Sequence, residues 1–297
     1  MDRTDRAVVA LSLGRLEGTR QGGLVVFKGV PFAAPPVGER RWRSPQPVAP
    51  WQGVRQADRF GMTAPQNPML GGPGPEGEPE PQSEDCLYLN IWSPGLDDKR
   101  RPVLVWIHGG AFSIGSGSSP MYEGSVLSRR NDVVVVTVNY RLNLLGFLNL
   151  KEATGGRIPA TGNEGLLEQV AALKWVQEHI AAFGGDPDNV TIMGESAGSM
   201  SIACLLTMPV AKGLYHKAIL ESGVGNVTMS LDEAAEVGRL FLEVTGIGGD
   251  DVEALHALTE QQLLAAEIDL RKRLAQPWEP MRITVTAPVI DGEVITQ

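Results

Sequence analysis

The pentapeptide Gly194-Glu195-Ser196-Ala197-Gly198 has the residue types of a serine nucleophile held on a tight turn. It follows a short β-type run, Val190–Met193, and precedes small residues that favour a helix. A nucleophilic serine stands at the apex of a strained strand-to-helix turn, and glycines two residues to either side let strand and helix pack closely enough to expose its Oγ. The pattern therefore predicts acyl-transfer chemistry at Ser196.

Two further segments have the composition that such chemistry needs. His108-Gly109-Gly110-Ala111-Phe112 follows an apolar run, Val103–Ile107, and the backbone N–H groups of such a loop can bind the oxyanion of a tetrahedral intermediate. The segment Phe183–Asn189 contains paired glycines and an Asp-Pro pair, which give a helix stop and a turn before the run that leads to Ser196. Together the three segments predict a serine hydrolase.

The elements that must position these segments alternate along the chain after Cys86. Strands are predicted at residues 87–92, 103–107, 133–138, 190–193 and 218–220. A long helix is predicted at residues 164–183, where apolar side chains recur at helical spacing. Strands and helices in alternation indicate an α/β fold with a mostly parallel central sheet and helices on both faces.

The rest of the chain divides by composition, within a single predicted domain over residues 1–297. We expect an N-terminal β meander (1–60), a surface loop rich in proline and glycine (62–83), the core sheet with the oxyanion loop and the nucleophile turn (84–223), and a helical insertion with an extended tail (224–297). Helix is expected from Leu231 to about Leu274, and the tail is expected to be extended from Thr284 to Ile295.

Charge and composition exclude several classes of function. The 297 residues carry a net charge of −9 and contain no basic patch with interleaved aromatic residues, so neither nucleic acid nor an anionic membrane is an expected partner. No secretory signal or membrane-spanning run is evident. Two cysteines in separate elements favour a reducing compartment, the cytoplasm. Four histidines without a Cys/His/Asp cluster predict no metal site, and the chemistry needs no cofactor.

Several longer motifs, in one order along the chain, identify a family. The chain resembles the type-B carboxylesterases, the group that includes cholinesterases and bacterial p-nitrobenzyl-type esterases, from about residue 7 to its C-terminus. The matching segments are Phe27–Gly38 with Arg41-Trp42, Ser83–Asn90, Asn139–Arg141, Gly162–Leu167 and Phe183–Gly198. The resemblance implies an α/β-hydrolase fold, of which this chain would be the N-terminal portion, with the C-terminal strands of the sheet missing.

The resemblance also implies roles for residues around the turn. Ser196 would attack the ester carbonyl and form an acyl-enzyme. The N–H groups of Gly110, Ala111 and Ala197 would bind the oxyanion, although many relatives have a third glycine where this chain has Ala111.

Three neighbouring residues are expected to contact substrate, namely Glu195, Gly109 and Phe112. For Glu195 an alternative stays open, that of a buried carboxylate satisfied by backbone N–H groups.

Two ion pairs are implied in the same way, Arg41 with Glu84 and Arg141 with Glu168, and we interpret them as structural. Cys86 occupies a position that is disulfide-bonded in secreted relatives, but residues 62–67 contain no cysteine to pair with it.

The catalytic acid and histidine of this family follow the nucleophile. Because Ala287–Gly292 resembles the segment shortly before the acid, both are expected beyond Gln297, in a continuation of the chain or in a separate C-terminal polypeptide that completes the fold. None of the four histidines present is expected to act as the base: His108 is given a shape or hydrogen-bonding role, His179 belongs to the long helix, His216 to a turn, and His256 to the solvent face of a helix.

The sequence thus predicts a carboxylic ester hydrolase that acts on short- to medium-chain uncharged esters through a Ser196 acyl-enzyme. The alternatives are a non-catalytic binding module of the same fold and a carbamate or amide hydrolase.

Overall fold

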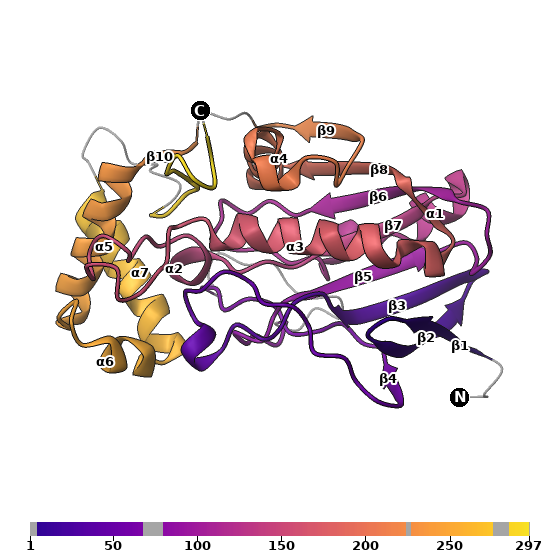
Figure 1. Ribbon diagram of the computed structural model, residues 1–297, viewed down its shortest axis with the longest axis horizontal. Coiled ribbons are helices and arrows are strands. Elements are labelled where there is room, and N and C mark those ends of the chain that lie inside the picture. Colours follow the sequence, from indigo (N-terminus) through magenta and orange to yellow (C-terminus); the bar gives the residue numbers. More distant parts are fainter. Residues whose placement is uncertain (1–4, 68–79, 224–226, 276–284, 297) are drawn as a thin grey trace.

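A nine-stranded sheet forms the centre of the molecule, in the order β1-β2-β3-β5-β7-β6-β8-β9 with β4 paired to β2 (Figure 1). The computed structural model describes residues 5–67, 80–223, 227–275 and 285–296. Within them the strands of this sheet are β1 (Arg6–Leu11), β2 (Gly14–Gln21), β3 (Leu24–Pro31), β4 (Val54–Gln56), β5 (Tyr88–Ser93), β6 (Arg101–Ile107), β7 (Val134–Val138), β8 (Gly185–Glu195) and β9 (Lys217–Glu221).

The sheet is mixed, and its two halves differ in strand direction. β7, β6, β8 and β9 are parallel, as the alternating pattern predicts. β1, β2, β3 and β5 pair antiparallel, and β5 also meets β7 antiparallel. β7 (VVVTV) is buried at every position, and four of its five residues are valine, as expected for a strand covered on both faces. The parallel half carries the predicted nucleophile turn and oxyanion loop at the carboxyl ends of β8 and β6.

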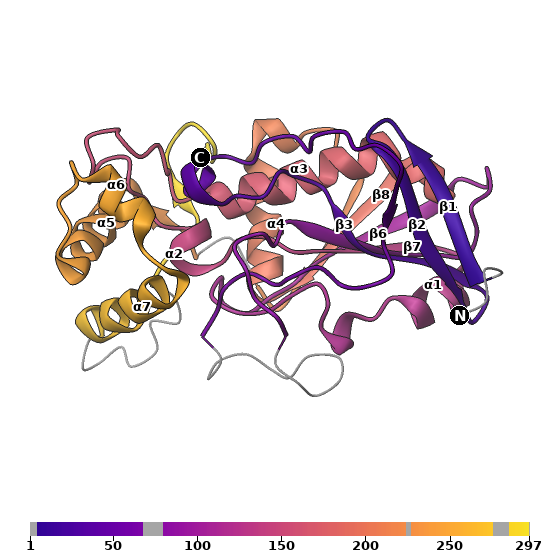
Figure 2. The same cartoon turned by 90° about the horizontal axis from the view of Figure 1, so that it is seen from below.

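Helices cover both faces of this sheet (Figure 2). α3 (Glu164–His179) and α4 (Ala197–Thr207) pack against β8, and Gln169 of α3 donates a hydrogen bond to Ser201 of α4 (3.1 Å). On the opposite face α1 (Ser125–Asn131) packs against β5 and β7. A short helix, α2 (Asn143–Gly146), is completely buried between the sheet and the last helices.

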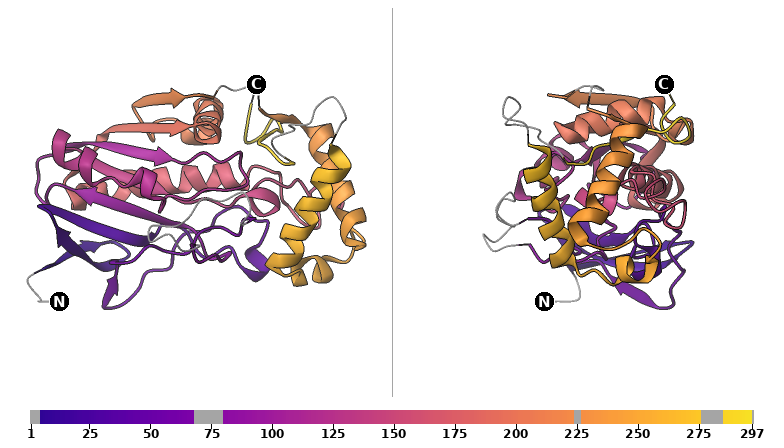
Figure 3. Two further views of the ribbon diagram at one scale, coloured as in Figure 1. Left: turned by 180° about the vertical axis from the view of Figure 1, so that it is seen from behind. Right: turned by 90° about the vertical axis from the view of Figure 1, so that its left-hand side faces the viewer.

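The last three helices gather at one end of the molecule, toward which the arrows of β6 and β9 point (Figures 1 and 3). They are α5 (Leu231–Thr245), α6 (Val252–Ala257) and α7 (Glu260–Leu274), which confirms the predicted helical stretch and divides it at two turns. A separate apolar cluster containing Trp42, Leu144, Phe241 and Leu270 joins them to the sheet domain.

Two expected segments fall partly outside the described residues. Of the proline- and glycine-rich loop, residues 68–79 are not described, whereas its flanks pair at Thr63 and Gln82. Of the tail, Thr284 is not described, and a two-residue strand, β11 (Val289–Ile290), pairs parallel with β10 (Met229–Ser230). No helix in the described part of the chain is both long and apolar enough to cross a membrane.

Both implied ion pairs are present and buried. Arg41 Nε donates to Glu84 Oε2 at 2.7 Å, and the Arg41 Nη2 group also contacts Glu84. The Arg141 and Glu168 side chains are completely inaccessible to solvent. Cys86 is a free, buried thiol.

Candidate active site

Ser196 occupies a strained turn between β8 and α4. Its φ of 53° and ψ of −120° lie in a region that residues with a side chain rarely adopt, at a cost of roughly 1–3 kcal/mol. Neighbouring backbone holds it there: Ser196 N donates to Glu221 O of β9 (2.9 Å), and Ser196 O accepts from Met200 N (2.9 Å). The turn projects the Ser196 side chain at the carboxyl end of the sheet, where the sequence predicts a nucleophile.

The two glycines of the pentapeptide allow a close backbone approach to the end of β6. A Cβ on Gly198 would lie 2.0 Å from Ile107 O, and a Cβ on Gly194 would lie 2.7 Å from the same oxygen. Neither position therefore accepts a side chain while β8, α4 and β6 keep this packing.

The strand register brings the second motif beside the first. Ile107 of β6 pairs with Gly194 of β8, so the residues that follow each strand meet at the same edge. A Cβ on Gly109 would lie 3.2 Å from Ser196 Cβ and 3.1 Å from Glu195 Oε2. Because Gly109 has no side chain, the loop can lie this close to Ser196.

Carbonyl contacts fix the direction of the N–H groups in this loop. Gly109 O lies 2.8 Å from His108 Nδ1, and Gly110 O accepts from both Ser113 N and Ile114 N at 3.0 Å. The Gly109 carbonyl shares a peptide with the Gly110 N–H, and the Gly110 carbonyl shares one with the Ala111 N–H. Because the C=O and N–H of a trans peptide point in opposite directions, these two N–H groups point away from the groups that bind the carbonyls.

The third expected donor, the Ala197 N–H, belongs to the first turn of α4, where backbone N–H groups have no partner within the helix.

The loop is itself strained. Ala111 and Phe112 have φ values of 54° and 57°, and Gly110 has a φ of 109°. Phe112 is completely buried, and its ring packs against Phe147 at a tilt of 58° with ring centroids 4.9 Å apart. Its backbone carbonyl accepts a hydrogen bond from Asn143 N (2.7 Å). Its side chain therefore packs into the core beneath the loop.

His108 is a buried, neutral support of the loop. Its ring stacks on Tyr140 at 4.4 Å, and Tyr140 OH donates to His108 O (2.8 Å). Burial lowers the pKa of His108 to about 4, partly offset by the contact with Gly109 O. The neutral ring donates through Nδ1–H to that carbonyl, which agrees with the hydrogen-bonding role predicted from sequence.

We predict that His108 makes the fold sensitive to acid. Its folded pKa of about 4 lies below the usual 6.5, so the folded state binds fewer protons in this window and loses stability as the pH falls from 6.5 to 4. The full loss is about 3 kcal/mol. Urea unfolding of wild type and His108→Asn at pH 7 and pH 4 tests this, since asparagine keeps a donor but does not titrate. An identical pH dependence in both proteins would contradict it.

The other three histidines have partners away from Ser196. His216 is exposed and its Nδ1 accepts from Val190 N (3.1 Å). His179 is buried on α3 and packs on Trp175. The expectation that His256 faces solvent is wrong: it is half-buried, its ring lies 5.6 Å from Trp42, and its Nδ1 contacts Gly38 O, because α6 packs on the N-terminal segment.

Glu195 lies beside the turn at the edge of a hollow. A cavity of about 620 Å³ is lined by Glu195, Glu221, Tyr122, Trp106 and the apolar residues around them. Burial and the neighbouring Glu195 carboxylate raise the pKa of Tyr122. Within the described residues no backbone N–H donates to the Glu195 carboxylate, so the alternative of a carboxylate satisfied by N–H groups finds no support there.

Several supporting residues of the loop were not anticipated from the sequence. Gln66 bonds Gly115 twice, through Gly115 N–H to Oε1 (2.8 Å) and through Nε2–H to Gly115 O (3.0 Å). Arg271 Nη2 donates to Ser113 Oγ (2.8 Å). The Glu267–Arg271 spacing on one helix suggests an ion pair, but no sequence signal points to the distant loop.

The described residues contain neither a group of three potential metal-ligating side chains nor a histidine hydrogen-bonded to Ser196.

A mixed sheet with helices on both faces, and a strained serine between a parallel strand and the helix that follows it, define an α/β-hydrolase fold of the serine type. The family model described as "Carboxylesterase family" matches residues 5–297. The chain belongs to the carboxylesterase family.

Relatives of known name are similar over most of this chain. The para-nitrobenzyl esterase of Bacillus subtilis is 48% identical over 264 residues, which are 89% of this chain and 53% of that protein. The cholinesterase of Mus musculus is 36% identical over 97% of this chain and 49% of its own length. The solved carboxylesterase EST55 of Geobacillus stearothermophilus superposes with a TM-score of 0.88 and 46% identity, over 98% of this chain and 57% of that one. The chain spans about half the length of the curated relatives it matches.

Proposed function

We propose that this protein hydrolyses carboxylic esters through an acyl-enzyme on Ser196. Ser196 Oγ attacks the ester carbonyl carbon, the C–O bond to the alcohol breaks, and the alcohol leaves with the proton that the serine gave to a general base. Water then attacks the acyl-enzyme and releases the acid. The observation that carries the proposal is the strained Ser196 turn packed against a loop of oriented N–H groups.

The Gly110, Ala111 and Ala197 N–H groups are proposed to bind the oxyanion in both steps. Such donors stabilise the transition state more than the ground state, and loss of one typically costs about 3 kcal/mol. Gly109 is proposed to give the substrate carbonyl access to Ser196, Glu195 to line the substrate site, and Phe112 to act from the core by shaping the loop.

We propose that the general base and its acid lie beyond Gln297, because each histidine of this chain has a partner elsewhere. The polypeptide that carries them would cover the outer edge of β9 and the hollow lined by Trp106 and Glu195. Support comes from the exposure of Ile219 and Leu220 on β9 and of Met121, Val126 and Leu127 next to the hollow, since apolar side chains that gather in this way favour a protein partner.

Uncharged esters of short to medium chain are the proposed substrates. Glu195 directly precedes Ser196 and pairs in register with Glu221 of β9, and the negative charge of two carboxylates next to the turn opposes the approach of anionic substrates. Relatives named as a para-nitrobenzyl esterase and a cholinesterase support ester chemistry. The cytoplasm is the proposed location, supported by two cysteines that are both free thiols.

The test compares the hydrolysis of p-nitrophenyl butyrate with that of a matched carbamate and a matched amide. The protein assayed includes the polypeptide that is proposed to carry the general base and its acid. The ester is expected to be turned over fastest, with an organophosphate labelling Ser196. Faster turnover of the carbamate or the amide would replace the proposed reaction class. A folded protein that neither turns over any of the three nor is labelled would instead be a binding module.

A further inference from the structure

Helix α7 contacts the oxyanion loop through one guanidinium nitrogen. Arg271 Nη2 donates to Ser113 Oγ and to Glu267 Oε1, both at 2.8 Å, so its two hydrogens serve two acceptors. Ser113 and Glu267 are buried at 3% and 2% exposure. Glu267 lies one helical turn before Arg271 and therefore orients the guanidinium toward the loop.

Ser113 closes the turn that orients an oxyanion donor. Its N–H bonds Gly110 O (3.0 Å), and that carbonyl belongs to the same peptide as the Ala111 N–H. The N–H of the next residue, Ile114, bonds the same carbonyl (3.0 Å), so a shift of the segment that begins at Ser113 would weaken both bonds and let this peptide rotate. The position of the Ser113 hydroxyl therefore bears on the direction of the Ala111 N–H.

The oxyanion loop needs hydrogen bonds from neighbouring elements because its backbone is strained. Positive φ angles at Ala111 and Phe112 persist only where surrounding contacts hold them. Asn143 and Gln66 hold the loop from the sheet domain, whereas Arg271 holds it from the helical end.

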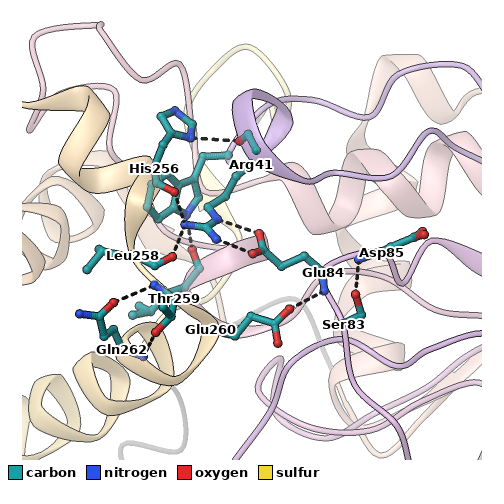
Figure 4. Close-up of polar contacts among 12 residues, drawn as sticks. Arg41, Ser83, Glu84, Asp85, His256, Leu258, Thr259, Glu260 and Gln262 are labelled. Carbon is teal, nitrogen blue, oxygen red and sulfur yellow. Dashed lines mark hydrogen bonds and ion pairs between the residues drawn. The ribbon is translucent and has the colours of Figure 1, made fainter.

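The beginning of α7 is fixed to the sheet domain (Figure 4). This gives Arg271, further along the same helix, a defined position. Arg41 Nη1 donates to His256 O (3.0 Å) and Leu258 O (2.7 Å), just before the helix begins. Glu84, the ion-pair partner of Arg41, donates its backbone N–H to Glu260 (2.9 Å) in the first turn of α7. The helix then buries Leu270, next to Arg271, in the apolar cluster that contains Trp42.

We propose that Arg271 is a positioning residue for the oxyanion hole: from α7 it holds Ser113 and, through the Ser113–Gly110 turn, aims the Ala111 N–H at the reacting carbonyl. This inference rests on the proposed ester hydrolysis. It makes the helices that follow the sheet part of the catalytic support, and it predicts an effect on turnover rather than on substrate binding, since Arg271 contacts the loop and not the serine.

The test is a double-mutant cycle of Arg271→Met and Ser113→Ala, measured in the protein with every segment that turnover requires. Each single variant is expected to lower kcat about tenfold with KM within about twofold, and the double variant is expected to be no worse than either, because both remove the same contact. Organophosphate labelling of Ser196 should slow by a similar factor. Arg271→Lys, which keeps a cationic donor, should recover most of the rate.

Arg273→Met is the matched control, because Arg273 lies on the same helix and pairs with Glu243 of α5 (3.1 Å) instead of the loop. It should leave kcat unchanged. Should Arg271→Met fail to fold in thermal melts, Ser113→Ala alone still tests the contact, since it removes a single hydroxyl.

Two outcomes overturn the inference while wild type stays active: variants with unchanged kcat, or losses that multiply in the double variant. A wild-type protein without Ser196-dependent ester turnover would instead overturn the proposed function itself.

Discussion

Ser196→Ala is expected to lower ester turnover by about 10⁴-fold or more, because the acyl-enzyme cannot form without the Ser196 hydroxyl. Alanine keeps the Cβ, and the backbone bonds to Glu221 and Met200 involve no side-chain atom, so the fold should persist. Steady-state hydrolysis of p-nitrophenyl butyrate and mass spectrometry of organophosphate-treated protein measure the two consequences.

The matched control for this prediction is Ser201→Ala, on the same helix α4. The Ser201 hydroxyl bonds Gln169 within the core, away from the turn, so this variant should keep turnover and stoichiometric labelling. Persistent labelling or turnover in Ser196→Ala would show that another nucleophile carries the reaction.

Glu168→Gln is expected to lower the stability of the fold strongly. Arg141 and Glu168 are both completely buried, and Glu168 Oε2 also accepts from Arg141 N (2.7 Å). Burial raises the pKa of Glu168, against the lowering effect of Arg141. Removing the carboxylate leaves the Arg141 charge buried without its partner, which should cost about 3–5 kcal/mol in the free energy of unfolding. Urea unfolding at pH 7 measures it.

Glu178→Gln on the same helix provides the comparison. The Glu178 side chain is 65% exposed, so this substitution should change stability by less than about 0.5 kcal/mol. Equal effects of the two substitutions would mean that the buried pair does not hold the fold.

The sequence was sufficient for the parts of the site that depend on local pattern. β-type runs, helix-stop glycines and small residues define the Ser196 turn within a few positions, and the apolar composition of β7 shows that it is covered on both faces. The two buried ion pairs were accessible only through the family resemblance, since nothing local links Arg41 to Glu84 or Arg141 to Glu168.

Contacts between distant segments could not be predicted, for a physical reason. A polar helix with one histidine suggests solvent exposure, yet His256 packs on Trp42 because α6 meets a segment more than two hundred residues earlier in the chain. Arg271 and Ser113 are likewise 158 positions apart. Such hydrogen bonds leave no periodicity in the sequence, and the direction of a peptide N–H depends on which carbonyls are bound, which only the folded chain determines.

The strand order has a consequence for the sequence of folding events. β1, β2 and β3 pair with their neighbours along the chain, so this part can form early at little loop-closure cost. β6 lies between β7 and β8, and β8 comes eighty or so residues after β6, so the parallel half closes late. The strained conformation of Ser196 depends on both Ile107 and Glu221 being in place. Recovery of a reactive Ser196 during refolding would therefore mark the final step of assembly and lag behind the return of secondary structure.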